Sequence, residues 1–313
     1  MKIVFMGTPE FAAAALDALI RAGHEITAVV TQPDKPKGRG RQLMAPPVKE
    51  LALLHNIPVL QPVKIKRPEE IAVLKQYEAD VYVVAAFGQI LSQEILDIPR
   101  YGCLNIHASL LPAYRGAAPI QWCILRGEKK TGVTIMQMDA GLDTGDMLTK
   151  AEVPILDTDT AESLEEKLMQ AGADLICRTL PLVEQGKLQP EKQGECPFYA
   201  KLLDKSMGQV QFASRSAEEI DLLIRGLYPW PTAYCSFRGK NMKLLAGRVL
   251  PEAPAGSAPG NAGQICAVDK NSITVTCREG FLQITRLQPE GKKAMDVKDF
   301  LLGNAVKPGD MLE

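Results

Sequence analysis

The first half of the chain alternates short apolar segments with longer periodic ones, and this alternation restricts the fold more than any other feature. The apolar segments are rich in branched or aromatic residues, as strands buried on both faces are: Ile3–Met6, Ile26–Thr31, Val81–Ala86, Leu104–His107 and Val133–Met138. The periodic segments between them predict helices: Glu10–Ala22, Val48–His55 and Glu69–Tyr77. Strands joined by helices form a parallel sheet with right-handed crossovers, and ligands bind at the carboxyl ends of its strands.

The pattern changes in the second half. Asp159-x-x-Glu162 has the spacing of a capping box and predicts the start of a helix that continues to about Gln185. The polar, proline-broken stretch after it predicts a linker. Short apolar runs separated by turn-rich pieces then predict the strands of a small barrel or sandwich: Ala233–Phe237, Lys243–Val249, Gln264–Val268, Ser272–Cys277 and Phe281–Leu287. We therefore predict domains at residues 1–188 and 207–313, joined by a linker at 189–206.

Length and composition fit this division. The chain has 313 residues, which at roughly 150 residues per domain suggests two domains. Its net charge of −1 means that any polyanionic partner must be held by a local patch. The seven cysteines are scattered without C-x-x-C spacing, which argues against a disulfide framework and a zinc site. Since neither a signal peptide nor a membrane span is recognisable, we expect a protein of the cytoplasm.

The first candidate for chemistry is the end of the predicted strand Leu104–His107. Residues two apart on a strand point to the same side, so Asn105 and His107 would stand together over the ligand crevice. An amide N–H can stabilise an oxyanion, and an imidazole can move protons near neutral pH. This pair suits acyl transfer to an amine. The alternative is a hydrogen-bonded strand-end histidine beside a turn-forming asparagine.

A second candidate is the acidic turn from Met138 to Asp146. Three carboxylates and two glycines follow an apolar strand, and glycine permits tight turns close to a ligand. A carboxylate beside His107 would orient the imidazole ring. Asp143 is the preferred residue for this role, ahead of Asp139 and Asp146. A solvated acidic turn or a cation site remains the alternative.

A third candidate is the basic segment that follows the predicted strand Ile26–Thr31. Four cations alternate there with glycine and proline: Lys35, Lys37, Arg39 and Arg41. Contacts with about four phosphates would give a log–log salt slope near −3. The segment therefore favours nucleic-acid binding over the alternative of a merely solvated loop.

Two further motifs favour structural roles. Gly7-Thr8-Pro9 has one glycine where a dinucleotide fingerprint has three, so it predicts a tight turn rather than an NAD site. Tyr228-Pro229-Trp230-Pro231 places two aromatic residues between prolines. We expect them in the core of the second domain, with stacking on a base or ribose as the minority alternative.

These segments together resemble the methionyl-tRNA formyltransferase family over nearly the whole chain. The resemblance rests on six segments: Phe5–Phe11, Lys35–Arg41, Asn105–Arg115, Thr131–Asp146, Pro229–Pro231 and Leu287–Lys293. It implies a Rossmann-like α/β catalytic domain followed by an OB-fold-like β-barrel. It also implies 10-formyltetrahydrofolate as the donor and initiator methionyl-tRNA as the acceptor.

The resemblance also assigns residues, and Asn105, His107 and Asp143 match the family's catalytic set. The positions matching its folate-contacting residues are Phe87, Gly88, Gln89, Ile90, Leu91, Ser109, Leu110, Leu111, Pro112, Asp139, Gly141, Leu142 and Thr144. Those matching its tRNA-binding loop are Lys35, Lys37, Arg39 and Arg41. The chain departs from the family at Ser92, Gln211 and Phe212.

Three other functions remain open at this point. The chain could formylate a small amine such as a ribonucleotide or an amino sugar, or bind tRNA without catalysis. A dehydrogenase is the third option, although the glycine fingerprint is missing. The sequence offers no plausible His and Cys set for a metal, and we infer neither a membrane association nor an obligate protein partner.

Overall fold

The computed structural model describes residues 1–37, 42–257 and 260–313. The chain forms two compact units. Unit 1 comprises Met1–Pro119, Lys130–Pro154 and Glu165–Ala200, and unit 2 comprises Ile120–Lys129, Ile155–Leu164 and Lys201–Glu313. The division at 189–206 remains a prediction.

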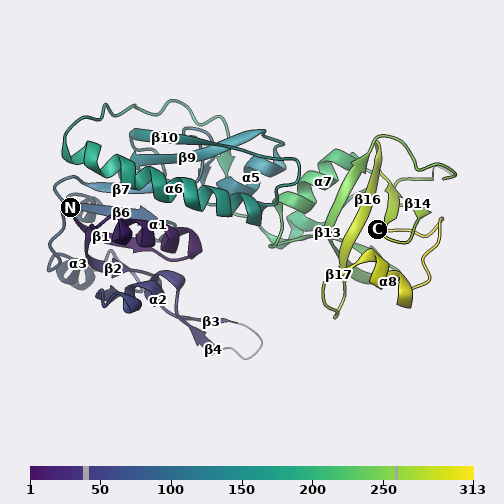
Figure 1. Cartoon of the computed structure of the whole chain (residues 1–313), viewed down its shortest axis with the longest axis horizontal. Helices are drawn as coiled ribbons and strands as arrows, with labels where there is room; N and C mark the ends of the chain where they lie inside the picture. Colours follow the sequence, from purple (N-terminus) through teal and green to yellow (C-terminus); the bar gives the residue numbers. More distant parts are fainter. Residues whose placement is uncertain (38–41, 258–259) are drawn as a thin grey trace. The chain divides into compact units, whose positions relative to one another are not determined.

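Unit 1 is built on one twisted sheet with the strand order β10-β9-β7-β6-β1-β2-β5 (Figure 1). The strands are β1 (Lys2–Gly7), β2 (Glu25–Val30), β5 (Val59–Leu60), β6 (Val81–Ala85), β7 (Cys103–His107), β9 (Lys130–Gln137) and β10 (Met147–Pro154). Every pair from β7 to β5 is parallel. The central strands β1, β6 and β7 are buried on both faces, as their continuous apolar sequences predict. The predicted α/β fold is therefore confirmed.

The predicted strand Val133–Met138 is present as β9, but it runs antiparallel to β7. His107 is paired with Thr134 and Leu104 with Gln137, so β9 starts at the edge where β7 ends. The connection between the two strands therefore does not cross the sheet, as a parallel crossover would. Strand β10, which the sequence did not indicate, follows β9 as its antiparallel partner.

The helices of unit 1 are α1 (Glu10–Arg21), α2 (Pro47–Leu54), α3 (Pro68–Leu74), α4 (Gln93–Leu96) and most of α6 (Ala161–Glu184), whereas α5 (Pro119–Leu125) falls almost wholly in unit 2. The predicted turn at Gly7 requires glycine, because a Cβ there would lie only 2.5 Å from the Cβ of Ala12 in α1. The predicted capping box of α6 is wrong by one residue. Thr160 and Ser163 exchange the capping hydrogen bonds, while Asp159 accepts from Leu156 and Ser163.

The basic segment begins in a strand that forms a small hairpin with the residues after Arg41. Strand β3 (Lys35–Lys37) pairs antiparallel with β4 (Gln42–Met44), and Lys35 is exposed. Arg39 and Arg41 lie outside the described residues. The base of the hairpin is held by Asp34, whose carboxylate accepts hydrogen bonds from Lys49 and Gln61. The bond from Lys49 is the main reason that the pKa of Asp34 lies below its usual value.

Unit 2 contains an antiparallel sheet with the order β12-β13-β16-β15-β14, and β17 pairs with β16. Its elements are η1 (Lys205–Gly208), α7 (Ala217–Gly226), β12 (Ala233–Phe237), β13 (Lys240–Leu250), β14 (Ile265–Val268), β15 (Ile273–Thr276), β16 (Phe281–Pro289), β17 (Met295–Asp296) and α8 (Val297–Gly303). Met311 bridges to Gln264, just before the edge strand β14, and Leu312 bridges to Phe237, the last residue of the edge strand β12. These bridges draw the two edges together, which agrees with the predicted barrel.

One prediction for unit 2 is wrong. Trp230, expected in the core, is 51% exposed, and only Tyr228 of the aromatic pair is partly buried. Thr232, just after the second proline, is the buried residue of this turn, and its hydroxyl donates to the carbonyl of Pro229. The prolines thus hold a turn that leaves the indole at the surface.

Two expectations from the sequence concern a metal site and a membrane-spanning helix. Among the described residues, no three His, Cys, Asp or Glu side chains gather where they could hold a metal ion. None of the helices in residues 1–37, 42–257 and 260–313 combines the length and the apolar character that crossing a membrane requires.

Candidate active site

The candidate active site lies at the carboxyl ends of the parallel strands of unit 1. Gly7 of β1 is paired with Ala85 of β6, and Val84 of β6 with Asn105 of β7. The loops that follow these three strands therefore start side by side at one edge of the sheet. Open α/β sheets bind their ligands at this edge.

His107 is the last residue of β7 and is only 6% exposed. Its Nε2 atom lies 3.1 Å from the carbonyl oxygen of Tyr114. Because a carbonyl can only accept, Nε2 carries a proton in this arrangement. The other ring nitrogen, Nδ1, lies 3.9 Å from Oδ1 of Asp143. The carboxylate therefore faces the nitrogen that can gain or lose a proton.

Asp143 lies in the acidic turn between β9 and β10, with a left-handed backbone at φ 53°. Its second carboxylate oxygen accepts a hydrogen bond of 3.0 Å from the backbone N–H of Gly116. The turn is shaped by Asp139, whose side chain accepts from the N–H of Gly141 and the hydroxyl of Thr144. Asp139 is therefore engaged within the turn, and Asp143 is the carboxylate that faces His107.

Asn105 precedes His107 by two positions on the same strand, so both side chains project from the same face. It is 9% exposed, and its amide has no hydrogen-bond partner among the residues that the structure describes. Buried amides normally have partners. The Asn105 amide is thus a nearly buried donor that remains available to a ligand at the strand end.

The loop after β6 contains the first group of predicted folate contacts. The carbonyl of Phe87 accepts hydrogen bonds from Thr8 and Gln32, and Gly88 takes a positive φ of 78°. Gln89 bonds to the backbone of Pro62 and Ile65, so its amide holds the loop. Phe87 and Leu91 are buried, whereas Ile90 is 60% exposed.

The other predicted folate contacts also divide into buried and exposed residues. Ser109 is fully buried, and its hydroxyl donates to Ala113 while its carbonyl accepts from Thr134. Leu111 is buried and donates its N–H to the Thr134 hydroxyl. Leu110 and Pro112 are half-buried, and Leu142 is 53% exposed. Ile90 and Leu142 are therefore the apolar side chains that these loops offer most openly.

Several residues of the site were not identified from the sequence. The carbonyl of Tyr114 and the N–H of Gly116 hold the side chains of His107 and Asp143. Gln193 bonds to the backbone of the acidic turn. Two of these groups are backbone atoms, and Gln193 lies in a segment without regular periodicity, so no sequence signal marks them.

Comparison with known proteins gives two family matches. The family described as "Formyl transferase" matches residues 1–180, and "Formyl transferase, C-terminal domain" matches residues 202–305. A protein named methionyl-tRNA formyltransferase from Clostridium acetobutylicum is 50% identical over 100% of both chains. Another of that name, from Alkaliphilus metalliredigens, is 49% identical over 100% of this chain and 98% of its own length.

Solved structures with lower identity share the fold. HypX from Aquifex aeolicus has a TM-score of 0.67 at 18% identity, over 98% of this chain, which spans 49% of the HypX chain. An N-formyltransferase from Helicobacter canadensis, in complex with folinic acid and dTDP-3-aminofucose, has a TM-score of 0.66 at 19% identity. That match covers 91% of this chain and 98% of the other.

Proposed function

Since the chain belongs to the methionyl-tRNA formyltransferase family, we propose that it transfers the formyl group of 10-formyltetrahydrofolate to the free amino group of initiator methionyl-tRNA. The observation that carries the proposal is the arrangement at the end of β7. There a nearly buried amide without a partner among the described residues stands beside an imidazole that faces a carboxylate. The product, N-formylmethionyl-tRNA, would serve translation initiation, which places the proposed reaction in the cytoplasm.

Each of the three side chains has a proposed role in the transfer. Asn105 donates a hydrogen bond to the formyl oxygen as negative charge develops there. His107 moves protons between the attacking and leaving amines through Nδ1, because Nε2 is engaged with the Tyr114 carbonyl. Asp143 balances the positive charge that the ring gains.

The loops around this set are proposed to hold the two substrates. The folate donor would lie between the loop Phe87–Leu91 and the acidic turn, where Ile90 and Leu142 expose apolar side chains. The residues Ser109–Pro112 would complete this side of the site. The basic segment would bind phosphates of the tRNA with Lys35, Lys37, Arg39 and Arg41. Positioning the amine beside the formyl carbon would supply much of the rate enhancement.

A direct assay tests the proposal. The purified chain is incubated with 10-formyltetrahydrofolate and charged initiator tRNA, and formylmethionine is measured after hydrolysis of the ester bond. Because no protein partner is proposed, the chain alone should produce it. A parallel reaction with an amino-sugar nucleotide tests the small-amine alternative. Formylation of that substrate but not of the tRNA would overturn the tRNA assignment.

Substitutions distinguish an enzyme from a tRNA-binding protein. Asn105→Ala and His107→Ala should each reduce kcat by about 100-fold or more while tRNA binding is retained, since both act on the reacting atoms. His55→Ala is the matched control, because His55 is exposed at the end of α2. If His107→Ala keeps full activity, the proposed role of the imidazole is wrong.

A further inference from the structure

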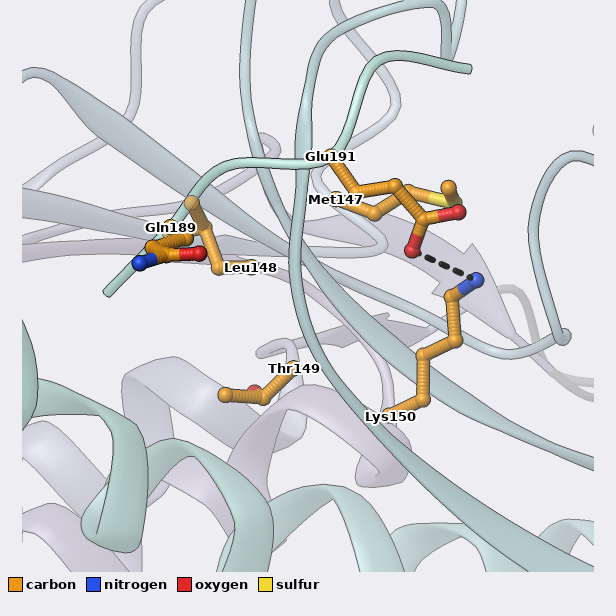
Figure 2. A pocket seen from close by; sticks show the side chains of 6 residues that line it. All are labelled: Met147, Leu148, Thr149, Lys150, Gln189 and Glu191. Atoms are coloured by element: carbon orange, nitrogen blue, oxygen red, sulfur yellow. Dashed lines mark ion pairs between the residues drawn. The ribbon is translucent and has the colours of Figure 1, made fainter. Parts of the chain in front are cut away.

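The segment 189–200, predicted as part of a linker, lies against the candidate site. Glu191 and Met147 exchange backbone hydrogen bonds of 2.8 and 2.9 Å at the start of β10. Figure 2 shows the Glu191 carboxylate directed toward Lys150, and their charged atoms lie 3.6 Å apart. This anchoring places the next residues beside the acidic turn, which ends where β10 begins.

Gln193 uses both ends of its side-chain amide to join two loops. Nε2 donates to the carbonyl oxygen of Asp143 at 2.9 Å and to that of Gly145 at 2.7 Å. Oε1 accepts a hydrogen bond of 2.7 Å from Nε of Arg115. A single side chain therefore connects the acidic turn with the loop after β7.

Arg115 extends this connection along the same segment. Its guanidinium also donates to the carbonyl of Gly194 at 2.9 Å, and its strand β8 (Arg115–Gly116) pairs in parallel with β11 (Tyr199–Ala200). The neighbours of Arg115 on either side hold the site itself, because Tyr114 accepts from His107 and Gly116 donates to Asp143.

The backbone of Asp143 needs such support. Its φ of 53° is the left-handed region, which costs a non-glycine residue free energy unless its surroundings compensate. The distance of 3.9 Å to His107 is too long for a hydrogen bond. His107 therefore does not fix the carboxylate, and its position depends on Gly116 and on the backbone that Gln193 holds.

We propose that Gln193 is a positioning residue that holds the acidic turn so that the Asp143 carboxylate faces His107. This inference rests on the proposed formyl transfer, in which Asp143 acts on the imidazole. In this proposal Gln193 acts on turnover through the position of Asp143, and not by contact with the substrates.

A double-mutant cycle tests this route. Gln193→Ala should reduce kcat by about 10- to 100-fold, since a displacement of about 1 Å can cost 100-fold. KM for either substrate should change less than about threefold. In an Asp143→Ala background, the same substitution should change kcat less than about twofold, because the carboxylate it positions is gone. An equal loss in both backgrounds would overturn the proposal.

Two more variants serve as controls for the cycle. Gln189→Ala removes an exposed glutamine of the same segment (Figure 2) and should leave kcat unchanged. Gln193→Glu keeps the acceptor for Arg115 but turns a carboxylate toward two carbonyl oxygens. It should therefore be at least as damaging as Gln193→Ala, and a fully active Gln193→Glu enzyme would contradict the argument.

A measurement without turnover separates this inference from the proposed function. The chain has three histidines, so the ring resonances of His107 can be assigned in NMR spectra by their loss in His107→Ala. Asp143→Ala and Gln193→Ala should shift these resonances in the same direction, while those of His24 and His55 stay in place. If Asp143→Ala shifts them and Gln193→Ala does not, Gln193 has no positioning role, whether or not the chain formylates tRNA.

Discussion

Gly116 lies where two constraints on a side chain meet, which makes its substitution by alanine a sharp test of the site. Its φ is 118°, a conformation that L side chains rarely adopt. A Cβ at this position would lie 2.5 Å from the carbonyl oxygen of Ala200, against an ordinary contact distance of 3.4 Å. The two strands β8 and β11 must therefore separate locally by the difference, about 0.9 Å.

This separation moves the N–H that Gly116 donates to Asp143 at 3.0 Å. Because a misplacement of about 1 Å in a catalytic arrangement can cost about 100-fold, kcat for formyl transfer should fall by about 100-fold. That loss corresponds to about 2.7 kcal/mol of transition-state stabilisation. The strained backbone should also lower the free energy of unfolding by about 1–3 kcal/mol.

Steady-state kinetics and urea unfolding measure the two effects separately. Gly186→Ala is the matched control, because Gly186 also has a positive φ, of 61°, but a Cβ there meets nothing within 4 Å. It should cost about 1 kcal/mol of stability without changing kcat. If the kcat of Gly116→Ala stays within about threefold of the unsubstituted value, or falls no more than that of Gly186→Ala, the link from Gly116 to Asp143 is refuted.

Three further predictions concern the tRNA contact and the two cores. Replacing Lys35, Lys37, Arg39 and Arg41 together by alanine should make the log–log salt slope of tRNA binding less negative by about 3, as filter binding at several salt concentrations would measure. An unchanged slope would show that the basic segment does not contact tRNA phosphates. Tyr82→Phe should raise the free energy of unfolding by about 1 kcal/mol, because the Tyr82 hydroxyl is buried without a partner in the described part of the chain; a loss of stability in urea would contradict this, and Tyr101→Phe is the half-buried control. Burial raises the pKa of the Cys235 thiol to about 12 from 9.0, so its contribution to stability is complete below about pH 9 and is lost as the pH rises toward 12. The urea midpoint should therefore fall above pH 9 less steeply in Cys235→Ala than in the unsubstituted chain, and identical slopes would disprove the assignment.

The parallel part of the sheet could be predicted because its strands carry their own signal. The segments of β1, β6 and β7 are apolar without interruption, which only burial on both faces explains. Strand β10 was not predicted because its sequence MLTKAEVP mixes polar and apolar residues, as a partly exposed strand at the end of the sheet does. The direction of β9 depends on where the chain re-enters the sheet, and local sequence does not encode that.

The unit 2 strands were predicted from short apolar runs between turn-rich pieces, whereas the surroundings of Trp230 were not predicted. An indole between two prolines has the composition of either a core turn or a surface turn. In the folded chain Trp230 is exposed, while Thr232 is the residue of this turn that is buried and bonded to the Pro229 carbonyl. The capping residue of α6 was misplaced because Asp159 and Thr160 both suit an N-cap, and only the hydrogen bonds decide between them.

The candidate site divides between residues that the sequence marks and residues that it does not, and chain distance explains the division. Asn105 and His107 are two positions apart on one strand, so strand geometry alone brings them together. Their juxtaposition with Asp143 requires the antiparallel return through β9, and the position of its carboxylate requires contacts from Gln193, which is 50 residues away. Closing so long a segment carries an entropic cost that the whole fold must offset before any such hydrogen bond can form. The contacts that hold the site therefore form only in the folded unit 1, whereas the pair of Asn105 and His107 can be predicted from the local sequence of strand β7.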